Sequence, residues 1–287
     1  MQNRTPAPLL SDAGTVGVDP FGIKTLYGSD SSKKASDWIS NWTGSLRTIS
    51  VAGLSDPQDP QTVMRGGGEI TFGNGEAVFY PQNPAPRLYI NKKESGSGFE
   101  NVEFTVYAKW EGSGYEQSYA GFTLMARTNH FLYESDGCNA AAYYTRIWES
   151  DGRVSFQKEY FHGASTVYSS SRLTNLFSQF PKSQWIGMKY VVYTIPGTTS
   201  VQLEIYVDLT DGIDGGAWQL AHSFLDSKGV MPALAVVPSQ CPIQSGDTVL
   251  GSRYSCTLRS DGGEIHWKKA SIRHILVSGM TSAPTPR

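Results

Sequence analysis

Apolar and polar residues alternate along several segments of the chain. In residues 102–110 and 201–208, every second side chain is apolar and the side chains between them are mostly polar. Successive side chains of a β-strand point to opposite faces of a sheet, so this pattern predicts strands with one face towards a core. Further strand patterns occupy residues 67–72, 76–80, 87–90, 119–130, 141–162, 185–193, 218–224 and 264–277. Helical periodicity is scarce, so the prediction is an all-β fold with two antiparallel sheets packed as a sandwich.

The segment from Tyr119 to His162 contains the strongest turn signal. Asp151-Gly152 predicts a two-residue hairpin turn, because glycine takes a positive φ without strain. That turn places three pairs on one exposed sheet face, Trp148 opposite Ser155, Arg146 opposite Gln157, and Tyr144 opposite Glu159. An odd number of loop residues would instead turn the other set to that face: Tyr143, Lys158, Tyr160 and His162.

Length and composition limit the classes of function. The chain has 287 residues, a net charge of -2 and only 17% charged residues, so bulk charge attracts neither nucleic acid nor an anionic membrane. No apolar run is long enough to span a bilayer. We expect a loose segment over residues 1–18, one sandwich domain over 19–278 and a flexible tail over 279–287. We also expect a monomer that is exported, with its signal peptide removed from this sequence.

The order of these elements resembles a known family. A Trp-bearing strand leads into a hairpin at Pro196-Gly197, whose second strand ends in Glu204-Ile-Tyr-Val-Asp208. An Asp/Gly turn then leads to Trp218, and the last strand contains His266-Trp-Lys-Lys-Ala-Ser-Ile-Arg273. Together these features resemble the concanavalin A-like lectin and glucanase jelly roll, which includes polysaccharide lyases and glucanases. The resemblance implies a glycan cleft on the concave sheet; in the lyases a Tyr or His moves protons while Gln, Asn or Arg neutralises a uronate.

Two motifs of that family are missing. The Glu-x-Asp-x-x-Glu signature of the common glucanases does not occur, and the alginate-lyase strand Tyr-Phe-Lys-Ala-Gly has only a distant counterpart in residues 157–162. The aromatic and polar side chains of the sheet face predicted within Tyr119–His162 nevertheless suit a sugar, since aromatic rings pack on its C–H faces and polar groups bind its hydroxyls. We expect the catalytic groups of a lyase for an acidic, uronate-containing glycan to be His130, Tyr144, His162 and Lys158. The expected substrate-binding groups are Arg127, Arg146, Gln157, Glu159, Tyr143 and Trp148.

Two other functions remain open at this point. A glycoside hydrolase needs two carboxyl groups, which Glu159 with Glu103 or Glu204 would supply if their strands were neighbours. A carbohydrate-binding domain without catalysis would use the same groove.

The chain requires no cofactor for either chemistry, but a structural calcium ion is one option. Asp208, Asp211 and Asp214 are closely spaced carboxylates of the kind that Ca²⁺ binds, although Asp and Gly at such spacing more often form a tight turn. No His-x-His or His-x-x-x-His spacing predicts a transition-metal site. Of three cysteines, we expect Cys241 and Cys256 to be linked, with Cys138 either free or taking one of those partners.

Overall fold

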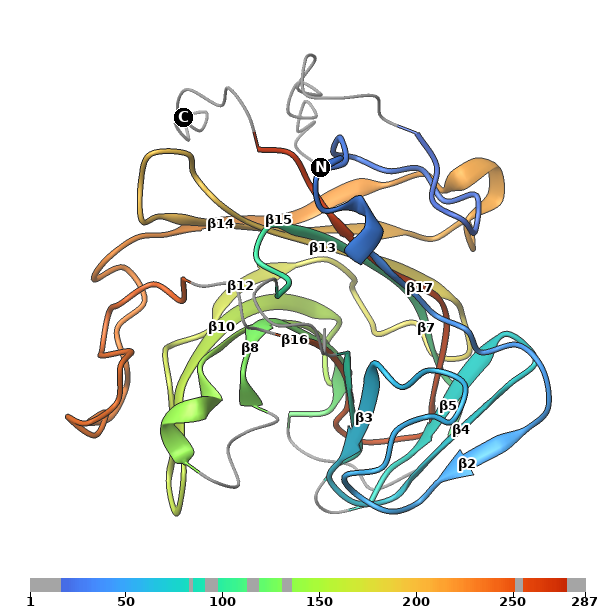
Figure 1. The fold of residues 1–287 in the computed structure, drawn as a ribbon, viewed down its shortest axis with the longest axis horizontal. Helices are drawn as coiled ribbons and strands as arrows, with labels where there is room; N and C mark the ends of the chain where they lie inside the picture. The colour runs from blue at the N-terminus through green and yellow to red at the C-terminus, as the bar shows by residue number, and fades with distance from the viewer. Residues whose placement is uncertain are drawn as a thin grey trace.

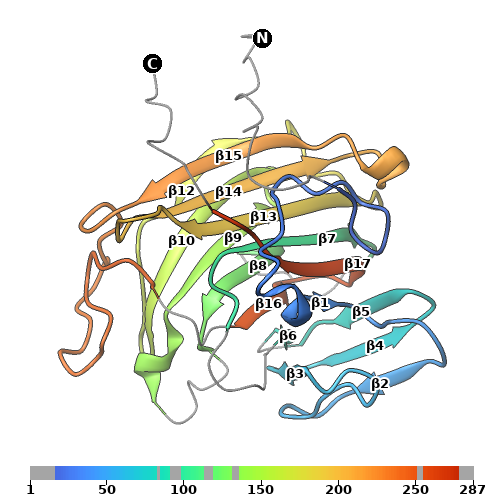
Figure 2. The same ribbon diagram turned by 45° about the horizontal axis from the view of Figure 1, so that its top comes forward.

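The computed structural model describes residues 17–82, 85–90, 98–112, 119–130, 136–250 and 255–277. Its strands are antiparallel and form two sheets, which confirms the predicted all-β sandwich. In Figure 1 the two sheets are nested arcs, so we call them the outer and the inner sheet; Figure 2 shows the same arrangement from a second direction.

The outer sheet has the order β15-β14-β13-β7-β17-β5-β4-β2, and β1 pairs with β17. Its strands are β1 (Trp38–Ile39), β2 (Arg47–Ile49), β4 (Glu69–Gly73), β5 (Glu76–Tyr80), β7 (Val102–Trp110), β13 (Ile186–Thr194), β14 (Val201–Asp208), β15 (Gln219–Asp226) and β17 (Ile265–His274). The alternation read from the sequence holds in β7 and β14, whose apolar residues belong to the core. Their polar residues point outward, yet Glu103 is fully buried because the backbone of Leu26 and Tyr27 covers it and donates hydrogen bonds to its carboxylate.

The inner sheet has the order β11-β10-β9-β8-β16-β6-β3, and β12 pairs with β10. Its strands are β3 (Thr62–Arg65), β6 (Arg87–Ile90), β8 (Gly121–Thr128), β9 (Ala142–Trp148), β10 (Arg153–His162), β11 (Thr166–Tyr168), β12 (Arg172–Asn175) and β16 (Ser255–Ser260). Short 3-10 helices lie at Lys34–Ser36, Gly137–Ala140 and Ile213–Gly215. No helix among the described residues is long and apolar enough to cross a membrane.

One apolar core fills the space between the sheets. Leu88, Leu124, Ile147, Phe156 and Leu258 come to it from the inner sheet, and Phe104, Tyr190, Leu203 and Trp267 come from the outer sheet. The neighbouring residues of each inner strand must therefore point to the opposite face, inside the curve of the sheet. We call this the free face of the inner sheet.

The β9–β10 hairpin differs from the sequence prediction in its turn. Four residues, 149–152, connect the strands, and Ser155 pairs with Arg146 instead of Trp148. Gly152 adopts a φ of 68° and its N–H bonds to the Trp148 carbonyl, which closes a longer loop than the predicted two residues. The resulting shift in register is two residues. An even shift keeps the side chains of both strands as far as Tyr160 on their predicted faces, so the division into two faces is correct there although the pairs are not.

Candidate functional site

A row of arginine side chains crosses the free face of the inner sheet. The strand register aligns Arg65 with Arg87, Arg87 with Arg259, Arg259 with Thr123, and Thr123 with Arg146. Directly paired residues of neighbouring strands share a face, so the four arginines lie on the same side. We call Arg65, Arg87, Arg259 and Arg146 the arginine row.

One buried carboxylate neutralises part of this positive charge. Asp261 accepts a hydrogen bond from Arg259 Nε at 2.6 Å and another from Arg146 Nη2 at 3.1 Å. Burial raises the pKa of Asp261, but the two guanidinium groups outweigh it and hold that pKa below its usual value. Asp261 therefore remains ionised and fixes the positions of two arginines.

The other two arginines of the row lack such a partner among the described residues. The Nε atoms of Arg65 and Arg87 are buried without a hydrogen-bond acceptor there, and no ion pair is formed by either side chain within that part of the chain. Arg87 is only 6% exposed. A buried guanidinium N–H without an acceptor is costly, so the two Nε atoms favour an anionic ligand.

A second group of polar side chains lies at one end of the free face. His130 Nε2 lies 3.0 Å from His162 Nδ1, and His162 Nδ1 lies 2.8 Å from Glu159 Oε1. The third distance, from His130 Nε2 to Glu159 Oε1, is 3.5 Å. We call these three residues the histidine cluster. His130 and Glu159 are fully buried, whereas the side chain of His162 is 23% exposed and forms the surface end of the cluster.

A β-bulge in β10 makes this cluster possible. Glu159 and His162 are three residues apart and would face opposite sides of a regular strand. The pairing between β10 and β11 shifts between Glu159 and Phe161, which turns His162 to the same side as Glu159. His130 arrives from the loop after β8, where its N–H bonds to the Thr128 hydroxyl.

Two tyrosines hold the cluster from behind. The Tyr89 hydroxyl lies 2.9 Å from His130 Nδ1, and the Tyr144 hydroxyl donates to Glu159 Oε2. Burial lowers the pKa of His130, and burial together with the charge of Glu159 raises the pKa of Tyr144 well above its usual value. The pKa of Glu159 falls to about 2, since the two histidines outweigh the opposing effect of burial. Glu159 is thus ionised at neutral pH.

The structure brings together most of the residues predicted for the site. Tyr144, Glu159, His130 and His162 are in direct contact, and Arg146, Trp148 and Gln157 share the same free face. Trp148 stacks against the Arg146 guanidinium at 4.8 Å and donates to the Ser155 hydroxyl, while Gln157 donates to the Ser169 carbonyl. The face is not exposed as predicted, because Tyr144 and Arg146 are 3% and 8% exposed.

Three predicted site residues lie elsewhere, and their assignment is corrected. Arg127 adopts a φ of 50° in a bulge of β8, and this turns its guanidinium away from the free face. The guanidinium instead donates hydrogen bonds to other segments, including the Val249 carbonyl and the Thr194 hydroxyl. Lys158 and Tyr143 point between the sheets, where both bind the carboxylate of Asp226. These three residues stabilise the sandwich and do not line the free face.

The proposed carboxylate pair of a hydrolase is not formed. Glu159 points to the free face of the inner sheet, whereas Glu103 and Glu204 point away from the core on the outer sheet. Packed sheets are about 10 Å apart, so carboxylates on their two outward faces are farther apart than hydrolysis requires.

The aspartates considered for calcium are used by the protein itself. Asp208 accepts hydrogen bonds from Tyr107 and from the backbone of Thr210, Gly212 and Ala217. Asp211 pairs with Lys268 at 2.7 Å, and Asp214 is exposed in a short 3-10 turn. Within the described residues, the side chains that converge as metal ligands are those of the histidine cluster, which the spacing in the sequence did not predict.

The cysteine pairing also differs from the expectation. Cys138 is bonded to Cys241, and Cys256 is a buried free thiol on β16. Cys256 faces the core, so its side chain cannot reach the loop that contains Cys241. The disulfide joins the 3-10 helix Gly137–Ala140, which packs on β10 beside His162, to the loop before β16.

Sequence reasoning missed Arg65, Arg87, Arg259 and Tyr89. The alternation in Arg87-Leu-Tyr-Ile90 was a usable signal, because it places Arg87 and Tyr89 together opposite two apolar residues. Their relation to Arg146 was not visible in the sequence, since it depends on the order of strands in the sheet.

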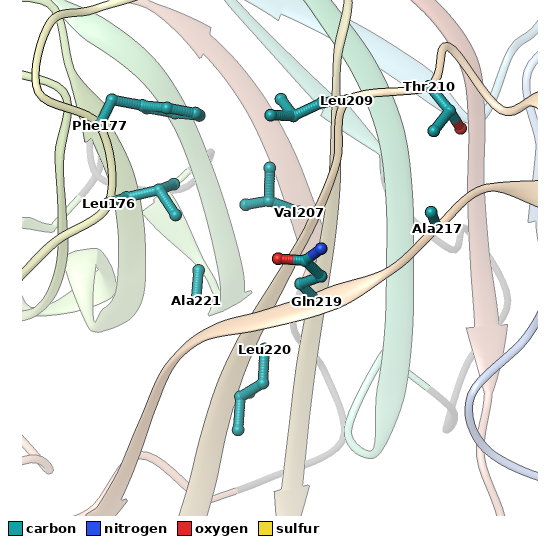
Figure 3. Close-up of a pocket in the computed structure, with 9 residues that line it drawn as sticks. All are labelled: Leu176, Phe177, Val207, Leu209, Thr210, Ala217, Gln219, Leu220 and Ala221. Carbon is teal, nitrogen blue, oxygen red and sulfur yellow. The ribbon is translucent and has the colours of Figure 1, made fainter. Parts of the chain in front are cut away.

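An apolar cavity of about 150 Å³ lies outside this face, between the segment after β12 and the strands β14 and β15 (Figure 3). Leu176, Phe177, Val207 and Leu220 line it, with Gln219 and Thr210 as polar neighbours. None of the side chains that line it is titratable.

Comparison with known proteins gives similarity of architecture only. No protein-family model matches the chain, and no curated protein does. The exoplasmic/lumenal domain of VIP36 in its Ca²⁺-bound form is similar over 84% of this chain and 94% of that domain, with 10% identity and a TM-score of 0.46. The receptor-binding domain of botulinum neurotoxin D is similar over 75% of this chain and 45% of the neurotoxin chain, with 10% identity and a TM-score of 0.39. The strand order confirms the two-sheet antiparallel sandwich predicted from the sequence, and no functional argument rests on these likenesses.

Proposed function

We propose that the free face of the inner sheet binds an acidic, uronate-containing polysaccharide and cleaves it by β-elimination. The observation that carries this proposal is the arginine row. Asp261 binds Arg259 and Arg146, whereas Arg65 and Arg87 form no ion pair within the described residues. Arginine binds carboxylates in a two-pronged geometry, so a polymer with a regular series of carboxylates matches a row of arginines.

Elimination also needs groups that accept and donate a proton. The acceptor removes the proton from C5 of the uronate, the electrons of that bond form the C4–C5 double bond, and the C4–O bond breaks as its oxygen is protonated. We assign proton transfer to the histidine cluster, at the end where His162 reaches the surface. Behind His162, the side chains of His130 and Tyr144 contact the Glu159 carboxylate and hold it in place.

Trp148 and Gln157 extend the proposed binding surface. Both are partly exposed and lie on the same face as Arg146, where a ring and an amide suit a sugar. The Cys138–Cys241 bond supports an extracellular location, since disulfides persist in oxidising compartments.

The test compares Arg87→Ala with Arg153→Ala on acidic and neutral polysaccharides. Arg153 is the matched control, because it is an arginine of the same sheet that pairs with Asp151 near the surface. Product is followed by absorbance near 235 nm, where the unsaturated sugar absorbs, and binding is followed by affinity electrophoresis. We expect Arg87→Ala to lose at least tenfold in activity on the acidic polymer, about 1.4 kcal/mol, and Arg153→Ala to stay within twofold of the wild type.

Each other result contradicts part of the proposal. Retardation by the acidic polymer without product would leave a binding domain and remove the lyase. Reducing ends without absorbance near 235 nm would indicate hydrolysis. Equal effects of the two substitutions, or no interaction with any acidic polymer, would refute the role of the arginine row.

A further inference from the structure

The histidine cluster has a geometry that hydrogen bonding within the protein does not require. Both imidazole rings direct a nitrogen at the same carboxylate oxygen, Glu159 Oε1, although the carboxylate has a second oxygen. The two nitrogens consequently approach each other to 3.0 Å. Three ligand atoms that converge on one point from three separate side chains are the arrangement found around a bound cation.

The opposite ends of the ligands are held in the manner of a metal site. His130 Nδ1, the nitrogen that does not face the cluster, is hydrogen-bonded to the Tyr89 hydroxyl. Glu159 Oε2, the oxygen that does not face it, accepts from the Tyr144 hydroxyl. Such outer hydrogen bonds orient metal-binding histidines and carboxylates, and in known sites their loss weakens metal binding by roughly 10- to 100-fold.

We propose that His130 Nε2, Glu159 Oε1 and His162 Nδ1 bind one divalent transition-metal ion, with Zn²⁺ as the ion of choice. Ligands at about 2.0–2.1 Å from a tetrahedral Zn²⁺ lie roughly 3.3 Å from one another. The three separations here are 2.8, 3.0 and 3.5 Å, so small side-chain movements suffice to admit the ion. Two imidazoles and one carboxylate favour Zn²⁺ over Ca²⁺, which prefers oxygen ligands in larger number.

The ion would also extend the proposed function, and this consequence alone rests on that proposal. The fourth position of the ion would face the surface end of the cluster, where His162 is partly exposed. A glycan carboxylate bound there would be neutralised by the ion, or a water bound there would take the place of the imidazole in proton transfer. The arginine row would still bind the neighbouring anionic groups.

Metal binding is tested without any glycan. The full-length protein is stripped with a chelator and titrated with Zn²⁺ by isothermal calorimetry, and the metal content after dialysis is measured by mass spectrometry. The variants are His162→Ala, which removes the partly exposed ligand, and Tyr89→Phe, which keeps all three ligands and removes one outer hydrogen bond. His266→Ala is the matched control, because His266 lies 2.8 Å from each of Glu76 and Glu264 on the outer sheet and is also partly exposed.

We expect one Zn²⁺ per chain in the wild type and in His266→Ala. His162→Ala should bind Zn²⁺ at least tenfold more weakly than the wild type. The Zn²⁺ affinity of Tyr89→Phe should lie between those of the wild type and His162→Ala. Substitution with Co²⁺ should give the intense visible absorption of a tetrahedral ion in the wild type and lose it in His162→Ala.

The proposal is wrong if the wild type takes up no Zn²⁺, or if His162→Ala binds as tightly as the wild type. It is equally wrong if His266→Ala is the variant that loses the ion. Zn²⁺ binding without cleavage of any acidic polymer would preserve the metal site and refute the proposed function. Full lyase activity of a protein that binds no metal would preserve the proposed function and refute the metal site.

Discussion

The buried pair of Lys158 and Asp226 gives the sharpest test of how the two sheets are held together. Lys158 Nζ on β10 lies 2.8 Å from Asp226 Oδ2 at the end of β15, and both side chains are fully buried. The same carboxylate oxygen accepts from Tyr143 at 2.6 Å, and the ammonium group also donates to the Asp247 carbonyl. We therefore expect Lys158 to be a structural residue that joins the inner to the outer sheet.

The substitution Asp226→Asn leaves the Lys158 ammonium group buried without its countercharge. Removing one partner of a buried ion pair costs about 3–5 kcal/mol in the free energy of unfolding. For a domain of this size each kcal/mol lowers the melting temperature by roughly 2–4 °C, so the loss is roughly 6–20 °C. The double variant Lys158→Met/Asp226→Leu removes both charges and should recover most of this loss, because buried pairs can be replaced by apolar residues at little cost.

The assay is urea and thermal unfolding of the wild type, the single variant and the double variant. Arg153→Met serves as a surface control, since the exposed Arg153–Asp151 pair should contribute no more than about 1 kcal/mol. A cost below about 1 kcal/mol for Asp226→Asn, or a double variant no more stable than the single one, would refute the reasoning. Loss of glycan cleavage in a stable Lys158→Met protein would return Lys158 to the catalytic residues.

Three further predictions follow from the described contacts. Peptide mapping under non-reducing conditions should recover Cys138 linked to Cys241, and reduction should lower the stability by about 4–5 kcal/mol for a loop of this length, whereas an unchanged melting temperature would contradict this. The pKa of Asp261 is lowered in the folded protein, so its carboxylate stabilises the fold above about pH 4 and loses this effect as the pH falls further. The stability difference between the wild type and Asp261→Asn should therefore shrink below pH 4, and a constant difference would be inconsistent with the pairing. Addition of a calcium chelator should leave the melting temperature unchanged, because the hydrogen bonds of the protein already occupy Asp208; a drop would restore the calcium hypothesis.

The sequence alone predicted the longer strands, such as β7, β14 and the β9–β10 hairpin, and which residues of each share a face, but it did not predict the short strands β3 and β16 that carry Arg65 and Arg259. Alternation with a period of two is a local property of the extended backbone, so it placed Tyr144, Arg146, Gln157 and Glu159 together without knowledge of the turn. The turn was predicted two residues too short, and the assignment survived because an even shift in register does not exchange the faces.

Bulges interrupt that local rule, and the sequence did not show where they occur. At Arg127 a backbone with positive φ directs the guanidinium between the sheets, although simple alternation places it on the free face. In β10 a bulge has the opposite consequence, since it brings His162 to the side of Glu159. Packing against neighbouring strands decides whether a bulge is stable, and no single strand contains that information.

The candidate site depends most on contacts between distant segments. Arg65, Arg87, Arg146 and Arg259 form a row only because β3, β6, β16, β8 and β9 lie next to one another in the inner sheet. The choice of Cys138 as the partner of Cys241 likewise follows from the burial of Cys256 in the core. Strand order and loop placement result from burying one apolar core between two curved sheets, so they are decided by the whole chain and only in the tertiary structure.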